Sequence, residues 1–127
     1  MPGVVERFLK YIQIDTESAH DASKVPSTEK QFALAQLLSQ ELMELGLQDV
    51  SVDEHAYVMA TLPANITHPA PVLGLIAHMD TSPDMSGANV KAQLVENYDG
   101  GDIVLDAGLE IVLSPRVFPE LLKYKGR

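Results

Sequence analysis

The chain has 127 residues, of which 46% are hydrophobic and 21% are charged, and its formal net charge is −9. This length favours a single domain, and the composition is that of a folded globular protein rather than a disordered tail. The acidic balance argues against a nucleic-acid partner, which normally needs a basic surface, and no apolar run reaches the roughly 18 residues that would suggest a membrane span.

The cysteine content and the opening residues bear on the cellular location. Cysteine is absent, which excludes disulfides and thiolate zinc sites. The first residues, MPGVVERFLKYIQIDTES, carry charges inside their apolar stretch and lack the layout of a signal peptide. We therefore expect a cytoplasmic protein.

Two helices are predicted in the first part of the chain. Residues 4–14 place apolar side chains near one face at helical spacing, which indicates an amphipathic helix. A second helix is expected to begin at Thr28, which fits a capping box with Gln31. It should end at Gly46, where a left-handed C-terminal cap belongs. A stripe of leucines along this helix predicts its core face: Leu34, Leu38, Leu42 and Leu45.

Strands are predicted in the middle of the chain. Residues 47–52 and 55–63 read as two short strands, which we expect to form a hairpin with its bend near Asp53. Residues 71–77, PVLGLIA, contain no polar side chain, which is typical of a strand covered on both faces. This run therefore predicts a central strand in a helix-covered sheet.

The last third of the chain gives shorter signals. We expect a short strand within residues 89–97, a turn-rich stretch over 98–108 and another strand at 109–114. Ser114-Pro115 favours a helix over residues 114–124. The fold class is therefore α/β, but incomplete, because a mixed sheet with a central parallel strand needs more neighbours than these elements provide.

An ionisable pair, His78 and Asp80, follows the apolar run in LGLIAHMDTSPD. In a strand the two side chains would share a face, at an end of the sheet where ligand crevices form. The carboxylate can accept a hydrogen bond from the imidazole Nδ1–H and leave Nε2 for a metal ion. The pair could instead orient a general base, or simply be solvated.

This spacing alone does not make a metal site, since zinc usually takes at least three protein ligands. The other histidines lie in polar or turn-rich segments that predict surface positions: His20, His55 and His68. Metal chemistry and a solvated strand end both remain open on the residues alone.

The run PVLGLIAHMDTSPD resembles the first metal motif of the co-catalytic zinc aminopeptidase and deacylase superfamily. More narrowly, it resembles that of the peptidase T, or tripeptide aminopeptidase, family. Other stretches follow the same family's pattern: VERFLKYIQIDTES, VPSTEKQFALAQLLSQELMELGL, VMATLPAN, GANVKAQLVENYDGGDIVL and LSPRVFPEL. The resemblance implies that residues 1–127 are the N-terminal portion of a metallopeptidase catalytic domain, without the family's smaller lid domain.

The resemblance also implies roles for individual residues. His78 corresponds to a ligand of one of two zinc ions, and Asp80 to the catalytic aspartate that hydrogen-bonds this histidine. The rest of the DTSPD run is expected only to shape the loop. The metal-bridging aspartate, the glutamate base and the remaining ligands have no counterpart in this sequence. We therefore expect the 127-residue segment alone to be inactive.

In the complete enzyme, two zinc ions would activate a water molecule that removes the N-terminal residue from a tripeptide. Short peptides are thus the expected partners, and a homodimer of the parent enzyme is possible because the family includes dimers.

Two alternatives stay open: another hydrolase of the superfamily, such as a carboxypeptidase or an N-acyl amino acid deacylase, or a non-catalytic truncated α/β module. The uncovered run at 71–77 also predicts self-association of the segment.

Overall fold

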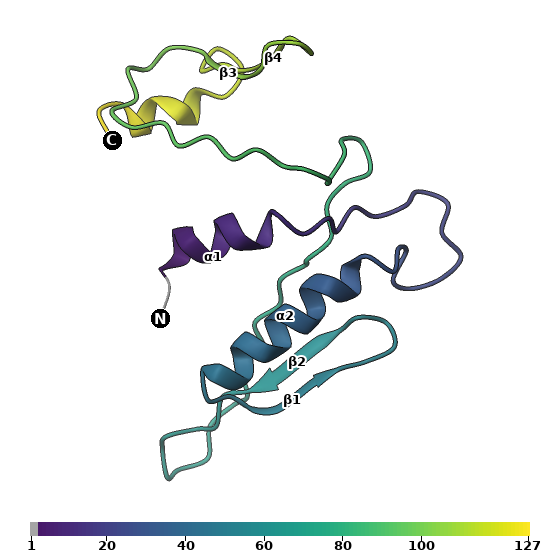
Figure 1. Ribbon diagram of the computed structural model, residues 1–127. Coiled ribbons are helices and arrows are strands. Elements are labelled where there is room, and N and C mark those ends of the chain that lie inside the picture. The colour runs from purple at the N-terminus through teal and green to yellow at the C-terminus, as the bar shows by residue number, and fades with distance from the viewer. Residues whose placement is uncertain (1–2) are drawn as a thin grey trace. The chain divides into compact units, whose positions relative to one another are not determined.

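The computed structural model describes residues 3–127, which divide into two units, one ending at Val90 and the other running from Lys91 to Arg127. The helices and strands of the first unit are α1 (Val4–Tyr11), α2 (Gln31–Glu44), β1 (Gln48–Val52) and β2 (Val58–Thr61). Those of the second unit are β3 (Ile103–Asp106), β4 (Ile111–Leu113) and a short 3-10 helix, η1 (Pro119–Tyr124) (Figure 1). The α/β class is confirmed, with the strands in two small antiparallel sheets.

Helix α1 is shorter than the predicted helix. It ends at Tyr11 rather than near Ile14, because the N–H groups of Gln13 and Ile14 donate to carbonyls three residues back instead of four. Such tightening into a 3-10 turn is a common way for a helix to end. The chain then leaves the helix axis and enters the loop that leads to α2.

A carboxylate on α2 joins the two helices. Glu41 accepts a hydrogen bond from Lys10 Nζ at 2.7 Å on one oxygen and from the Tyr11 hydroxyl on the other. The Lys10 hydrogen bond, and after it the Tyr11 hydrogen bond, holds the pKa of Glu41 below its ordinary value. Glu41 therefore fixes the last turn of α1 against α2.

The beginning of α2 differs from the prediction, and its end confirms it. The prediction of a capping box at Thr28 is wrong. The Thr28 hydroxyl donates to the Glu17 carbonyl at 2.7 Å, and the helix begins at Gln31. At the other end Gly46 has a φ of +80°, a conformation that glycine adopts without a Cβ clash. The N–H groups of Gly46 and Leu47 donate to carbonyls in the last turn of α2, which is a Schellman cap.

Strands β1 and β2 form the predicted hairpin. The Asp53 carboxylate shapes the bend by accepting the N–H groups of His55 at 2.9 Å and Tyr57 at 2.8 Å. Helix α2 packs along this hairpin (Figure 1). In the leucine stripe, Leu34 is buried as predicted, and the other members are half-buried: Leu38, Leu42 and Leu45.

The predicted central strand is not formed. Residues 71–77 lie outside every strand of the described chain, and Val72 and Ile76 are 98% and 100% exposed. A strand covered on both faces needs paired neighbours, but each of the two hairpins pairs only within itself. The apolar run is therefore uncovered, as expected for an incomplete sheet.

The second unit corrects the predicted strands of the last third. Strand β3 lies inside the stretch assigned to turns, residues 98–108, while residues 89–97 contain no strand. Strand β4 lies within the predicted strand at 109–114. It pairs with β3 across a bend where the Asp106 carboxylate accepts two backbone N–H groups. The sequence did not predict this pairing of β3 with β4, because the glycines and aspartates around it are typical turn residues.

The predicted helix over residues 114–124 is reduced to η1. Proline at position 119 is tolerated as the first helical residue, but it disfavours helical backbone at the residue before it. Phe118 accordingly has φ −121° and ψ 77°, and the helix begins only at Pro119. Ser114 instead closes a turn, in which its carbonyl accepts the Val117 and Phe118 N–H groups.

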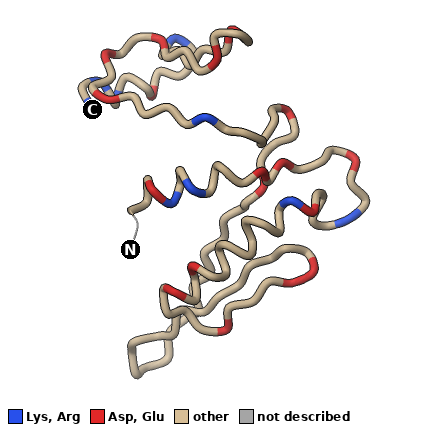
Figure 2. The backbone as a smooth tube through the Cα atoms, viewed as in Figure 1, with Lys and Arg blue, Asp and Glu red and all other residues tan. Residues whose placement is uncertain are grey.

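Charged residues lie along most of the described chain, but residues 55–79 contain no Asp, Glu, Lys or Arg. Figure 2 shows Asp and Glu in both units, with Lys and Arg interspersed among them, and a long uncharged stretch that includes β2 and the segment after it. Within residues 3–127, no helix combines the length and the apolar composition that crossing a membrane requires.

Candidate functional site

His78 and Asp80 lie together, with His78 Nδ1 and Asp80 Oδ1 3.2 Å apart. Because a carboxylate only accepts hydrogen bonds, this contact requires a proton on Nδ1 of the imidazole, and a neutral ring then leaves the Nε2 lone pair available. The side chains are 84% and 44% exposed. The expected hydrogen bond is thus present, in a position that solvent can reach.

The fit of this pair to a metal ion can be judged from its donor atoms. His78 suits the role of one zinc ligand, and Asp80 that of the carboxylate that orients it. Among residues 3–127, however, no three His, Asp or Glu side chains gather closely enough to hold a metal ion. The other ligands of a zinc site would have to come from outside these residues, and the roles of His78 and Asp80 stay predictions.

The loop after Asp80 is shaped by its own polar side chains. Ser82 Oγ donates to Asp84 Oδ2 at 2.6 Å, and the Asp84 N–H donates back to Ser82 Oγ at 3.3 Å. His20 Nε2 lies 3.8 Å from Asp84 Oδ1. These contacts fit the loop-shaping role expected for the DTSPD run.

A second group of residues, which the sequence did not single out, holds this loop; we call Asp15–Ser18 together with Lys30 the loop clamp. An isolated parallel bridge pairs Glu17 with Thr81. The Thr81 N–H donates to the Thr16 carbonyl at 3.2 Å, and the Thr81 carbonyl accepts the Ser18 N–H at 2.9 Å. The backbone next to Asp80 is therefore tied to the loop that follows α1.

Charged side chains extend the loop clamp to the far end of the same loop. Glu17 Oε2 accepts the Gly87 N–H at 3.1 Å. Lys30 Nζ lies 3.7 Å from this oxygen and 2.9 Å from Asp15 Oδ2. The Lys30 hydrogen bond lowers the pKa of Asp15, and the same bond raises the pKa of Lys30. Glu17 was visible in the sequence as part of DTES, but no local pattern could pair it with Gly87, 70 positions away.

Gly87 is buried at a point where the loop approaches the clamp closely. A Cβ atom at this position would lie 2.9 Å from Asp15 Oδ1, 3.1 Å from Thr81 Oγ1 and 3.3 Å from Glu17 Cβ. A side chain at this position would therefore require the surrounding side chains of the loop and the clamp to shift.

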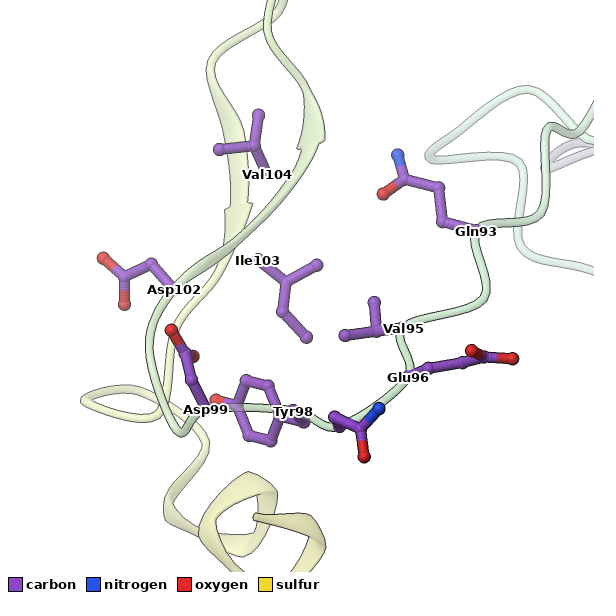
Figure 3. Close-up of a pocket in the computed structure, with 9 residues that line it drawn as sticks. Gln93, Val95, Glu96, Tyr98, Asp99, Asp102, Ile103 and Val104 are labelled. Carbon is purple, nitrogen blue, oxygen red and sulfur yellow. The ribbon is translucent and has the colours of Figure 1, made fainter. Parts of the chain in front are cut away.

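The second unit contains a separate hollow of about 370 Å³ beside Tyr98 (Figure 3). The Tyr98 hydroxyl donates to the Gly101 carbonyl at 2.6 Å, and burial, followed by the nearby aspartates, raises its pKa. Those aspartates are also engaged: Asp99 accepts the Gly101 N–H at 2.7 Å, and Asp102 accepts the Ser114 hydroxyl at 2.5 Å. These groups serve the local fold of the unit.

Comparison with known proteins gives strong matches over the whole chain. Peptidase T of Clostridium acetobutylicum (strain ATCC 824) is 59% identical over 127 residues, which is 100% of this chain and 31% of that protein. Peptidase T of Desulfitobacterium hafniense (strain Y51) is 61% identical over 127 residues, with the same two coverages. Peptidase T of Geobacillus sp. (strain WCH70) is 54% identical over 123 residues, 97% of this chain and 30% of that protein. Over nearly all of its length, the chain is similar to proteins named peptidase T.

The peptidase T resemblance stated from the sequence is thereby confirmed. Because the match extends over all 127 residues, it includes both HMDTSPD in the first unit and ENYDGGDI in the second. The chain spans about a third of the length of these peptidase T relatives, at 31% for two of them and 30% for the third, which agrees with an N-terminal segment. No family model matches the chain.

Proposed function

We propose that this chain supplies one metal ligand and its partner carboxylate to a zinc-dependent aminopeptidase that removes the N-terminal residue from tripeptides. The observation that carries the proposal is the 3.2 Å approach of His78 Nδ1 to Asp80 Oδ1 within HMDTSPD. It gains weight because the chain is 54% to 61% identical to proteins named peptidase T.

Asp80 orients the histidine in this proposal. By accepting the Nδ1–H, it holds the imidazole in one tautomer and raises the basicity of Nε2, the nitrogen that would face the metal. Asp80 also keeps 44% of its side chain exposed, so that a second carboxylate oxygen remains within reach of substrate or water. Zinc, when bound, would lower the pKa of a water molecule and polarise a peptide carbonyl.

The same proposal covers the partners, the assembly and the location of the protein. Short peptides are the partners that the reaction requires, and the whole protein could act as a homodimer. Absence of cysteine supports a cytoplasmic location, since disulfides are not needed there. The 127 residues alone should not catalyse hydrolysis, because a single histidine is too few ligands for zinc.

The test is a chimera in which this chain replaces the matching segment of the Clostridium acetobutylicum peptidase T. Zinc-dependent release of the N-terminal residue from a tripeptide should be retained. It should fall about 10- to 100-fold in Asp80→Asn, as for other lost partners of metal ligands, and at least as far in His78→Ala. His68→Ala, which removes another exposed histidine, is the matched control and should keep full activity.

Substrate comparison separates the alternatives. The protein is isolated from its source, and its intact mass is measured first. It is then assayed with a tripeptide, a dipeptide and an N-acyl amino acid. A preference for the acylated substrate would identify the protein as a deacylase and not an aminopeptidase. Full activity in the His78→Ala chimera would refute the proposed site, and stoichiometric tight zinc binding by the 127-residue chain would refute its dependence on further ligands.

A further inference from the structure

We propose that Glu17 is a positioning residue for Asp80: its carboxylate holds the loop at residues 81–87 and thereby keeps Asp80 against His78. The importance of that pair for catalysis rests on the proposed function. The geometric claim itself concerns contacts within this chain.

The segment that leads into His78 and Asp80 has little support from the rest of the described chain. Among residues 3–127, the backbone of residues 62–80 makes no hydrogen bond to the backbone of another described segment. The stretch that leads into His78 is also largely exposed. Nothing on the N-terminal side of the pair therefore fixes the position of Asp80.

Support comes from the C-terminal side, where Thr81 is bonded through both its N–H and its carbonyl to the loop clamp. Thr81 directly follows Asp80 in the chain, so that these two hydrogen bonds fix the backbone on one side of the aspartate. Glu17 is the bridge partner of Thr81, which places its side chain beside the anchored backbone.

The Glu17 carboxylate then closes the loop at its other end by accepting the Gly87 N–H at 3.1 Å. A carboxylate that accepts a backbone N–H makes a stronger hydrogen bond than a neutral acceptor. Its position is supported by Lys30, whose Nζ lies 3.7 Å away at the start of α2, and by its own N–H, which donates to Asp15 Oδ1 at 3.0 Å. The Glu17 side chain is only 25% exposed, so water competes poorly for these contacts.

The geometry around Gly87 gives an independent line of support. A Cβ atom there would meet Asp15 Oδ1 at 2.9 Å and Glu17 Cβ at 3.3 Å. A side chain at residue 87 would therefore require Asp15 to move and the contact with Glu17 to widen by a few tenths of an ångström. Gly87→Ala should displace the loop without changing any charge, which provides a second way to disturb the same contact.

The experiment uses the 127-residue chain without metal or substrate, labelled with ¹⁵N. At a pH of about 8, where imidazole is neutral, the ring nitrogen shifts of His78 report which tautomer is populated, and amide exchange reports the Gly87 hydrogen bond. In the unmodified chain we expect mainly the Nδ1–H tautomer. In Glu17→Ala the Gly87 amide should exchange on the order of tenfold faster, and the tautomer ratio should move toward that of free histidine.

Two further variants sharpen the result. Glu17→Gln keeps an acceptor for the Gly87 N–H and should restore much of the tautomer preference, whereas Gly87→Ala should lose it. Glu44→Ala, an exposed glutamate on α2, is the matched control and should change neither readout.

An unchanged His78 tautomer ratio in both Glu17→Ala and Gly87→Ala would overturn the positioning role. So would an unchanged Gly87 exchange rate in Glu17→Ala. Failure of the proposed function would appear elsewhere, as full activity of the His78→Ala chimera. The two ideas can therefore fail separately.

Discussion

Lys30 is the residue that joins the charges of the loop clamp. Its ammonium group lies 2.9 Å from Asp15 Oδ2 and 3.7 Å from Glu17 Oε2. One cation therefore forms ion pairs with two carboxylates in the loop after α1. The pKa of Asp15 is lowered and that of Lys30 is raised. Both changes have one cause, because the charged form of each residue stabilises the charged form of the other.

The pH dependence of this ion pair follows from the signs of the two changes. The folded pKa of Asp15 is below its ordinary value of 3.8, so the stabilisation is present above that value and is lost as the pH falls through the folded pKa. The folded pKa of Lys30 is above 10.5, so its contribution is present below 10.5 and is lost as the pH rises through the folded value. A carboxyl titration of Asp15 by NMR should therefore give a pKa below 3.8.

Replacement of the cation tests the cause. In Lys30→Met the pKa of Asp15 should return toward 3.8, while Lys91→Met, at an exposed position in the second unit, should leave it unchanged. A low Asp15 pKa that survives in Lys30→Met would show that the lysine is not the main cause.

At the scale of secondary-structure elements, the first unit depends on how its helices end and meet. The Schellman cap at Gly46 stops α2 and turns the chain into β1. The Glu41 carboxylate binds the last turn of α1 through Lys10 and Tyr11. Both features act at helix ends, where backbone groups or long side chains lack partners within their own helix.

Gly46→Ala should destabilise the chain through backbone strain alone. The φ of +80° is unfavourable for a residue with a Cβ atom, whereas no other atom lies within 4 Å of the added methyl group. We expect a loss of about 1–2 kcal/mol in the free energy of unfolding, measured with urea. Gly74→Ala has equally open surroundings without a positive φ and should change stability by less than about 0.5 kcal/mol. Equal effects of the two variants would exclude strain as the cause.

Tyr11→Phe should loosen the contact between α1 and α2. It removes the hydroxyl that donates to Glu41 and keeps the ring. A hydrogen bond to a charged group contributes about 1.5–3 kcal/mol, and the partial exposure of this site favours the lower end of that range. The measurement is urea unfolding combined with amide exchange in α1. Tyr57→Phe, on a 58% exposed tyrosine of the hairpin, is the control, and a matching loss there would argue against the Glu41 contact.

At the scale of the whole molecule, the main feature is an apolar run without a covering layer. The four large side chains of this run are between 82% and 100% exposed: Val72, Leu73, Leu75 and Ile76. Contiguous apolar surface of this kind favours association, and an extended segment with unpaired backbone groups offers hydrogen bonds as well.

The 127-residue chain should therefore self-associate as its concentration rises, which sedimentation velocity can measure. Val72→Lys combined with Ile76→Lys should shift the protein toward monomer by adding charge to the run. The control pair, Leu62→Lys with Ile66→Lys, places the same charges at exposed positions before it and should have little effect. A chain that stays monomeric at all concentrations would contradict this expectation.

Local patterns determined much of the first unit. Helical spacing located α1 and α2, Gly46 marked the end of α2, and the turn residues around Asp53 predicted the hairpin. Each of these depends on residues close together in the chain, so periodicity and turn chemistry are sufficient to detect them. The same is true of the contact between His78 and Asp80, which are two positions apart.

Features that join distant residues could be decided only by the tertiary structure. The Thr28 hydroxyl was expected to cap α2, but it bonds to Glu17 because the loop after α1 returns to that point. The pairing of Glu17 with Thr81 and Gly87 likewise spans the unit. The apolar composition of residues 71–77 predicted a buried strand, but burial depends on neighbours that no local pattern supplies. The sequence thus determined the local elements, the family resemblance and the candidate pair, whereas the tertiary structure decided which segments hold that pair and which stay uncovered.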